Sequence, residues 1–164
     1  MYFLKRIYRK SILPIALTAG LLGIACEHAD DPRCDEWYEQ AYGCLEEGQD
    51  EITEREEIDF DMDGKPDWIN ETGYDCLDNI VAERYDMNAD GKPDWIVDYD
   101  YNCDGQLSKK YYDIGGDGEC DYAQKYEYDK DGKLEKIRND WDCDGDYECY
   151  TLPSGCDDKC DVDR

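Results

Sequence analysis

The feature that most constrains this chain is an internal repeat built around Asp and Gly. Two ten-residue segments, 59–68 (DFDMDGKPDW) and 86–95 (DMNADGKPDW), match closely, and four looser copies start at 100, 113, 127 and 140. The six starts lie 27, 14, 13, 14 and 13 residues apart, and the double first step contains a degenerate unit at 73–79. A short unit that recurs in phase predicts one structural element used repeatedly.

The consensus of the copies is D-h-[DN]-x-D-G-x-x-[DE]-h, where h is apolar or aromatic. Oxygen-bearing side chains occupy positions 1, 3, 5 and 9, and the Gly at position 6 allows the chain to turn sharply. Such a loop surrounds one point with oxygen atoms, as Ca²⁺ with its about 6 to 8 oxygen ligands requires. Mg²⁺ retains several waters and Zn²⁺ prefers His and Cys, so both fit less well. The pattern therefore predicts calcium-binding turns.

The candidate calcium ligands come from five of the six copies. They are Asp59, Asp61, Asp63, Asp67, Asp86, Asn88, Asp90, Asp94, Asp113, Asp117, Asp121, Glu127, Asp129, Asp131, Glu135, Asp140, Asp142, Asp144 and Glu148. Complete sets of oxygen side chains occur in the loops 59–67, 86–94 and 140–148. Loop 127–135 has Glu at positions 1 and 9, and loops 113–121 and 100–108 are expected to bind weakly. For any single copy, the alternative is a solvated acidic turn, since Asp, Asn and Gly are common turn residues.

These loops resemble the calcium loops of integrin α-subunit propellers and related bacterial repeat proteins, in which the Asp at position 9 closes the site. The resemblance implies side-chain ligands at positions 1, 3, 5 and 9, and the backbone carbonyl at position 7, which belongs to Lys65 or Lys92 in the first two loops. It covers the loops only, because a propeller blade is far longer than one repeat. An EF-hand is excluded, because its loop ends in Glu at position 12. Position 12 here holds Asn70, Val97, Tyr111, Gln124, Arg138 or Thr151.

Between the loops, side chains alternate as they do in β-strands. Trp95, Val97, Tyr99 and Tyr101 fall on one face, and the segment 122–128 repeats this alternation with Tyr, Gln, Tyr and Tyr. We therefore expect a mainly β fold, an antiparallel β-meander of 13–14-residue repeats with calcium-loop turns at alternating edges. The stretch 126–137 also resembles the Tyr-Asp repeats of large bacterial surface and toxin proteins.

Upstream of the repeats, residues 31–57 lack Gly-Asp turns. Apolar residues at helical spacing there predict a short N-terminal helix that packs on the sheet. They are Trp37, Ala41, Tyr42 and Leu45.

The first 25 residues have the organisation of an export signal. Lys5, Arg6, Arg9 and Lys10 precede a charge-free apolar run at 11–25. That run is shorter than the roughly 20 residues that span a bilayer as a helix. Residues 22–26 (LGIAC) resemble the lipobox of bacterial lipoproteins, which implies lipidation of Cys26, although Gly23 stands where the family prefers Leu. The alternative is secretion without a lipid.

This resemblance implies a lipid-anchored protein of the bacterial cell envelope, at the outer membrane or cell surface. The expected organisation is a signal peptide at 1–25, a linker and short helix at 26–57, the repeat domain at 58–152 and a Cys-rich acidic tail at 153–164.

The chain is strongly acidic, with 44 Asp and Glu against 18 Lys and Arg and a formal net charge of -26. Nucleic acid is therefore excluded as a partner, because phosphates are bound through basic residues. Removal of residues 1–25 would leave 14 basic residues against 44 acids, a charge of -30. Such a chain repels itself unless cations neutralise it, so metal binding should be coupled to folding.

Ten cysteines in an exported protein predict disulfide bonds. The candidates are Cys34, Cys44, Cys76, Cys103, Cys120 and Cys143. Cys76 and Cys103 share one phase of the repeat, Cys120 and Cys143 share an edge, and Cys34 and Cys44 are close in sequence. Turns two strands apart are separated by roughly 9.6 Å, more than the about 6.8 Å that a disulfide spans between Cα atoms. Such pairs would need the turns to lean together, so the connectivity stays open.

Catalysis is not predicted. The single His, His28, lies beside the expected lipid anchor, which leaves no Ser-His or Cys-His dyad within the repeats. We expect a calcium-binding structural or binding module, attached to the membrane by its lipid, with glycan or protein as the candidate ligand. The alternatives are a metal-independent, disulfide-stabilised adhesion module and an accessory envelope hydrolase.

Overall fold

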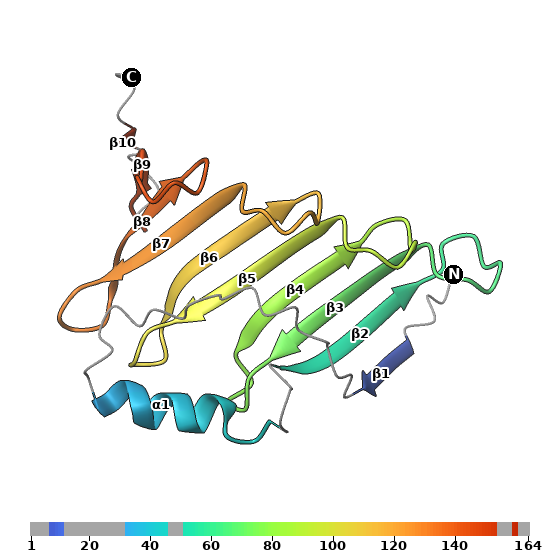
Figure 1. Ribbon diagram of the computed structural model, residues 1–164, viewed down its shortest axis with the longest axis horizontal. Helices are drawn as coiled ribbons and strands as arrows, with labels where there is room; N and C mark the ends of the chain where they lie inside the picture. The colour runs from blue at the N-terminus through green and yellow to red at the C-terminus, as the bar shows by residue number, and fades with distance from the viewer. Residues whose placement is uncertain (1–6, 12–31, 46–50, 154–158, 161–164) are drawn as a thin grey trace.

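The computed structural model describes residues 7–11, 32–45, 51–153 and 159–160. They form one helix and one antiparallel sheet, whose strands lie side by side in chain order from β1 to β10 (Figure 1). The prediction of a β-meander with a short N-terminal helix is thus confirmed. The helix α1 is Pro32–Tyr42. The strands are β1 (Ile7–Ser11), β2 (Ile52–Ile58), β3 (Trp68–Tyr74), β4 (Ile80–Asp86), β5 (Trp95–Tyr101), β6 (Leu107–Ile114), β7 (Tyr122–Tyr128), β8 (Leu134–Asp140), β9 (Cys149–Thr151) and β10 (Lys159–Cys160).

The described segments cover only part of the predicted N-terminal and C-terminal regions. Strand β1 falls inside the segment expected to be an export signal, whereas Cys26 and His28 lie outside the described residues. Within the described residues, no helix has the length and apolar character needed to cross a membrane.

Two kinds of turn alternate along the meander. We call the four nine-residue segments 59–67, 86–94, 113–121 and 140–148 the long turns. The first is a complete connection between two strands, and in the other three the first one or two residues belong to the preceding strand. The three segments 75–79, 102–106 and 129–133 are the short turns, each of five residues. Successive turns of the same kind start 27 residues apart. The structural unit is therefore a 27-residue β-hairpin. All the long turns lie at one end of the strands, which we call the long-turn edge, and all the short turns lie at the opposite end, the short-turn edge.

One strand and one turn together average 13–14 residues, as predicted, but the alternation corrects the bounds of two expected loops. The expected loops at 100–108 and 127–135 are wrong in their bounds, because Asp100 lies in β5, Glu127 in β7 and Glu135 in β8. Two of the three short turns also contain an Asp-Gly pair. The consensus pattern therefore did not distinguish the short turns from the long turns.

Left-handed backbone conformations give each kind of turn its shape. In the long turns, the Gly at position 6 has φ between 88 and 92° in all four copies, a conformation that favours glycine. Position 4 is also left-handed, and it is Met62, Ala89, Gly116 or Cys143. The fourth residue of each short turn adopts the same region, with φ of 61° at Asp78, 73° at Gly105 and 76° at Gly132.

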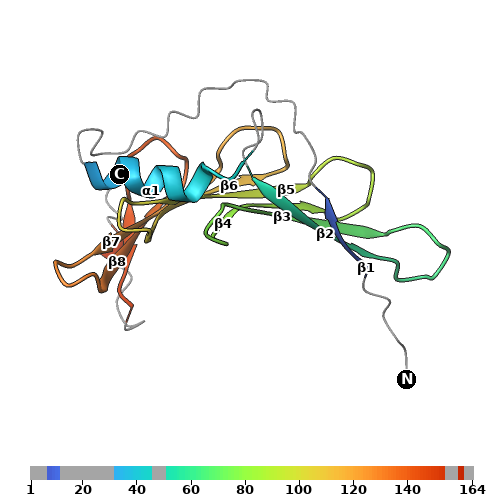
Figure 2. The ribbon, with the colours of Figure 1, turned by 90° about the horizontal axis from the view of Figure 1, so that it is seen from below.

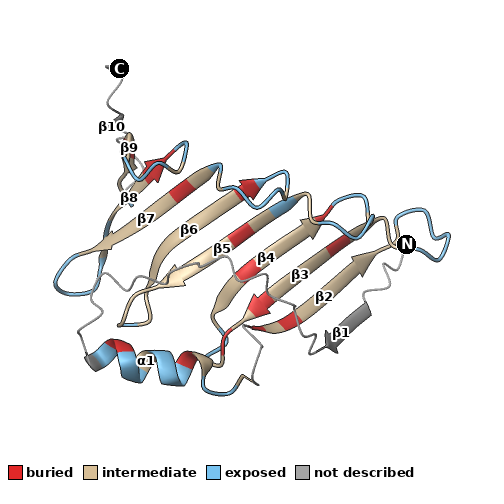
Figure 3. Cartoon of the chain, in the orientation of Figure 1, coloured by how far each residue is buried: buried red, intermediate tan, exposed pale blue. Residues whose placement is uncertain are grey.

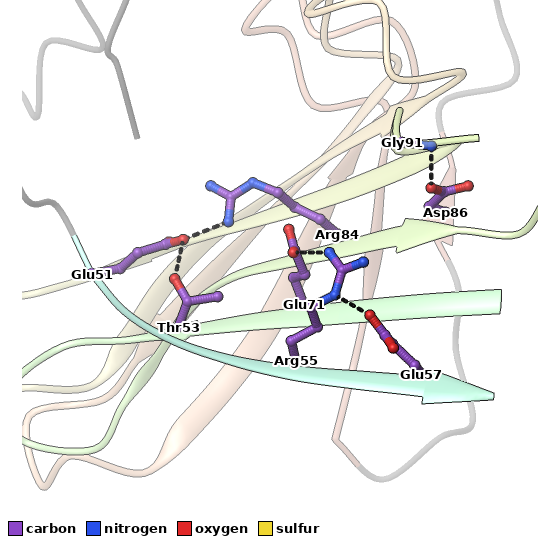
Figure 4. Close-up of polar contacts among 8 residues, drawn as sticks. All are labelled: Glu51, Thr53, Arg55, Glu57, Glu71, Arg84, Asp86 and Gly91. Atoms are coloured by element: carbon purple, nitrogen blue, oxygen red, sulfur yellow. Dashed lines mark hydrogen bonds and ion pairs between the residues drawn. The ribbon is translucent and has the colours of Figure 1, made fainter. Parts of the chain in front are cut away.

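The sheet is a single layer with a thin core. The buried apolar strand residues are mostly small or β-branched, namely Ile69, Ala82, Val97 and Ala123, and most other strand positions are half-buried (Figure 3). One face carries ion pairs between neighbouring strands (Figure 4). There Arg55 of β2 binds Glu71 of the neighbouring β3 at 2.5 Å, and Arg84 of β4 binds the buried Glu51, which directly precedes β2, at 2.6 Å.

Helix α1 lies along the edge that carries the short turns (Figures 1 and 2). The Trp37 ring lies 6.2 Å from that of Tyr101, between ring centroids, at the end of β5. Two disulfides fasten the helix region to that edge, Cys34 with Cys103 in one short turn and Cys44 with Cys76 in another.

All six candidate cysteines form disulfides, and the structure settles the connectivity that the sequence left open. Cys120 and Cys143 join two long turns, with 5.9 Å between their Cα atoms. Cys76 does not pair with Cys103, nor Cys34 with Cys44, because Cys34 in α1 and Cys44 just after it each bond to a cysteine of a different short turn. These turns therefore need not lean together. Cys149, in β9, is also disulfide-bonded.

Candidate metal-binding turns

In the long turns, the acidic side chains curl inwards and accept hydrogen bonds from the turn's own backbone. In the first turn, the amide of Gly64 donates to Asp59 at 2.9 Å, and the amide of Phe60 donates to Asp67 at 2.7 Å. Asp61 accepts from the amide of Asp63 at 3.0 Å. The carboxylates at positions 1, 3 and 9 thus point toward the interior of the turn, where a cation would lie.

The same two contacts, to positions 1 and 9, recur in the other long turns. At position 1, Asp86, Asp113 and Asp140 accept from the amides of Gly91, Gly118 and Gly145 at 2.8, 2.8 and 2.9 Å. At position 9, Asp94, Asp121 and Glu148 accept from the amides of Met87, Ile114 and Trp141 at 2.7, 2.6 and 3.1 Å. Four copies of one hydrogen-bonding scheme indicate that the consensus acids fix a common turn shape.

The long turns differ in how closely their acids converge. In turn 140–148, carboxylate oxygens of Asp140, Asp142, Asp144 and Glu148 lie within 4.8 Å of one another. In turn 59–67, Asp59, Asp61 and Asp67 do the same, whereas Asp63 is not part of the group. These are the two groups of three or more such ligands within the residues that the structure describes. The two middle turns have Asn88 and Gly115 at position 3, where the outer turns have Asp.

The position 1 acids are the most buried of the set. Asp140 is 2% exposed, Asp86 6% and Asp113 9%. The Oδ1 atoms of Asp140 and Asp59 are buried and have no hydrogen-bond partner. A buried carboxylate oxygen without a partner is unfavourable, because it loses its water and gains nothing in exchange. A bound cation would remove that penalty.

Other predicted ligands have different surroundings. Glu127 binds Lys136 at 3.0 Å and Arg138 at 2.8 Å. Burial acts to raise the pKa of Glu127, but the hydrogen bonds from these two cations outweigh it and lower the pKa below its usual value. Asp129 accepts from the amides of Asp131 and Lys133 and so closes a short turn. These residues form the sheet and its short turns and are not brought together as a metal site.

Sequence reasoning missed the role of Asp75, which lies in the degenerate unit. Asp75 is fully buried and accepts from the amides of Leu77 and Asn79, and from the side chain of Asn79. Asn102 and Asp129 occupy the same position in the other short turns, 27 and 54 residues further on. A comparison at a spacing of 27 residues would have grouped these three residues.

The two outer long turns thus combine convergent carboxylates with a buried oxygen that lacks a donor. Chemically, such a set can bind a hard divalent cation through oxygen atoms. The only described cysteine inside turn 140–148, Cys143, is in a disulfide and so offers no thiolate to a softer metal. No protein-family model and no curated protein matches this sequence.

Proposed function

We propose that this protein is a calcium-binding lipoprotein of the bacterial cell envelope, whose β-meander acts as a binding or structural module. Its membrane attachment would be a lipid on Cys26, at the outer membrane or cell surface. The observation that carries the calcium proposal is the turn 140–148, where four carboxylates converge around the buried, unpartnered Oδ1 of Asp140.

The charge of the turn favours a divalent cation. Four carboxylates within 4.8 Å of one another repel strongly, and more so where burial lowers the effective dielectric constant. Calcium tolerates irregular oxygen geometry, whereas magnesium demands a near-ideal octahedron. Turn 59–67 offers three carboxylates and is expected to bind more weakly.

Calcium binding would act mainly on the long-turn edge. The ion would replace repulsion between carboxylates by attraction to a common centre, so binding should stabilise the turns that carry it. An affinity of roughly 10⁻⁴ to 10⁻³ M is sufficient for a module outside the cell.

The direct test is a count of bound calcium on the oxidised protein, by equilibrium dialysis against radioactive calcium. We expect Asp140→Asn to weaken the tightest site at least about tenfold, because it removes the buried charge but keeps an acceptor for the amide of Gly145. Asp131→Asn, which changes the net charge equally in an exposed short-turn residue, is the matched control and should leave binding unchanged.

The second candidate is a metal-independent, disulfide-stabilised adhesion module. It is favoured by the backbone hydrogen bonds that the acids accept in every long turn, since these hold the turns in shape without an ion. Absence of bound calcium at about 1 mM, with identical circular dichroism in calcium and in chelator, would overturn the calcium proposal and favour this second candidate.

A further inference from the structure

A row of six aromatic rings runs across the strands on one face of the sheet, beside the long turns. Its members, which we call the aromatic row, are Trp68, Tyr85, Trp95, Tyr112, Tyr122 and Trp141. Successive ring centroids are 6.1, 6.0, 6.5, 5.2 and 4.8 Å apart. Tyr85 is directly opposite Trp95, and Tyr112 is opposite Tyr122. The row is therefore continuous from β3 to the end of β8.

Part of this surface is exposed and apolar. Trp95 is 36% exposed and Trp141, which stacks on Tyr122, is 58% exposed. The residues at position 2 of the other long turns are also exposed and apolar, with Phe60 66%, Met87 52% and Ile114 63% exposed. Apolar surface that recurs at each hairpin, rimmed by polar residues, is typical of a binding site.

Two of the rings, those of Tyr112 and Tyr122, are held in place by hydrogen bonds from their own hydroxyl groups. Tyr122 donates to Oδ1 of Asn139 at 2.6 Å, and Tyr112 donates to Oε1 of Gln124 at 3.1 Å. Gln124 in turn donates through Nε2 to the hydroxyl of Tyr122 at 2.9 Å. Burial raises the pKa of Tyr85, Tyr112 and Tyr122, so these phenols stay neutral. A platform fixed in advance loses little side-chain entropy when a ligand binds.

Charge limits which ligands can use this platform. The aromatic row contains only Trp and Tyr and so carries no charge, while the chain as a whole carries a formal charge of -26. Anionic polymers and anionic lipid are repelled by such a chain, and a second copy would bring a further -26 to the same interface. The complementary ligand is uncharged, extended and flat, with apolar ring faces and hydrogen-bonding edges.

We propose that the aromatic row binds a neutral polysaccharide chain that lies across the strands. The C–H faces of its pyranose rings would stack on the Trp and Tyr rings, above all on the exposed Trp95 and Trp141. This inference does not depend on calcium binding, because none of its residues is a candidate metal ligand.

The test is affinity electrophoresis of the oxidised, full chain in native gels that contain a neutral polysaccharide, with hydroxyethyl cellulose, laminarin and dextran as probes. Carboxymethyl cellulose, which has the backbone of the first probe but is anionic, is the charge control. We expect retardation by at least one neutral polymer and none by carboxymethyl cellulose. Trp95→Ala with Trp141→Ala should weaken binding about tenfold. Tyr38→Ala, at an exposed tyrosine of α1, should change binding by less than about twofold.

Trp141→Ala alone keeps the test valid if the double variant fails to fold, because Trp141 is largely exposed and its backbone amide remains to bind Glu148. The proposal is overturned if no neutral polymer retards the wild-type chain. It is also overturned if Trp141→Ala leaves retardation unchanged, or if the two tryptophans instead govern flotation with phosphatidylcholine vesicles or dimerisation in the ultracentrifuge. A chain that binds no calcium but is retarded would disprove the proposed calcium function alone.

Discussion

The same strands lead into the turns at both edges, but different interactions hold the turns at each edge. At the short-turn edge, a side-chain acceptor caps each turn, as the fully buried Asp75 does, and two disulfides fasten the α1 region to it. At the long-turn edge, carboxylates converge, the unpartnered Oδ1 of Asp140 is buried, and apolar side chains are exposed. The comparison indicates that the first edge is complete by itself, whereas the second is built to receive ligands.

The largest difference between the edges should appear when their disulfides are removed. The Cys34–Cys103 bond spans 69 residues, so Cys34→Ser with Cys103→Ser should lower the free energy of unfolding by about 4 kcal/mol. The Cys120–Cys143 bond spans 23 residues, and its removal should cost about 3 kcal/mol. Urea denaturation with and without calcium measures both.

Calcium should affect the stability of the two disulfide variants differently. Because Cys143 lies inside turn 140–148, calcium should restore part of the stability of the Cys120→Ser, Cys143→Ser variant and little of that of the other variant. Equal recovery of stability by both variants would contradict the proposal that calcium acts only at the long-turn edge.

The next largest effect should come from Asp75→Ala at the short-turn edge. The change leaves three hydrogen-bond donors without their buried acceptor and should cost about 3 kcal/mol, independently of calcium. Asp104→Ala, at an exposed short-turn residue whose ion pair with Arg33 is solvent-screened, should cost less than about 1 kcal/mol. Thermal unfolding of the two variants provides the comparison, and similar losses would show that burial of Asp75 is unimportant.

A smaller effect is expected from backbone strain in the long turns. Gly145 has φ of 91°, and a Cβ atom there would meet nothing within 4 Å, so Gly145→Ala should cost about 1 kcal/mol through conformation alone. Ala89→Gly, at a left-handed position with φ of 52°, should be neutral or slightly stabilising. Chemical denaturation at saturating calcium distinguishes them, and a stabilising Gly145→Ala would refute the assigned turn geometry.

The smallest effect concerns the strands between the two edges. Burial raises the pKa of Asp98, against a lowering by Arg84, so the folded state holds this proton more tightly than the unfolded state does. Stability from this group is therefore present at low pH and is lost as the pH rises from the unfolded pKa through the raised folded pKa.

Asp98→Asn should consequently stabilise the protein slightly at pH 7, with an advantage that shrinks as the pH falls toward the unfolded pKa. Unfolding curves recorded across that range, in chelator, measure the effect. A variant that is less stable than the wild type at pH 7 would mean that the attraction between Asp98 and Arg84 exceeds the cost of burial.

Much of the fold could be predicted from sequence, because turn chemistry and strand alternation are local. The long turns were located by their acids and Gly64 or its equivalents, and the shared edge of Cys120 and Cys143 was recognised from the repeat. The alternation of long and short turns could not be predicted in the same way, since an Asp-Gly pair occurs in both kinds of turn. The pairing of Cys34 with Cys103 depends on where α1 docks, which no local pattern encodes.

For the candidate site, the sequence supplied the ligand types but not their convergence. Turn 86–94 has a complete set of oxygen side chains, whereas the groups of three or more acids among the described residues occur only in the outer turns. The burial of Asp140 Oδ1 depends on packing around the end of β8, and this is not visible in spacing.

The 27-residue hairpin also sets a rule for how this molecule can change in length. Insertion or loss of a whole hairpin keeps every acidic turn at one side of the sheet and adds or removes two stacking rings. Duplication of half a unit would instead move all later acidic turns to the side that α1 occupies. A sheet of this kind can therefore gain or lose strands only two at a time if its acidic turns are to stay on one side.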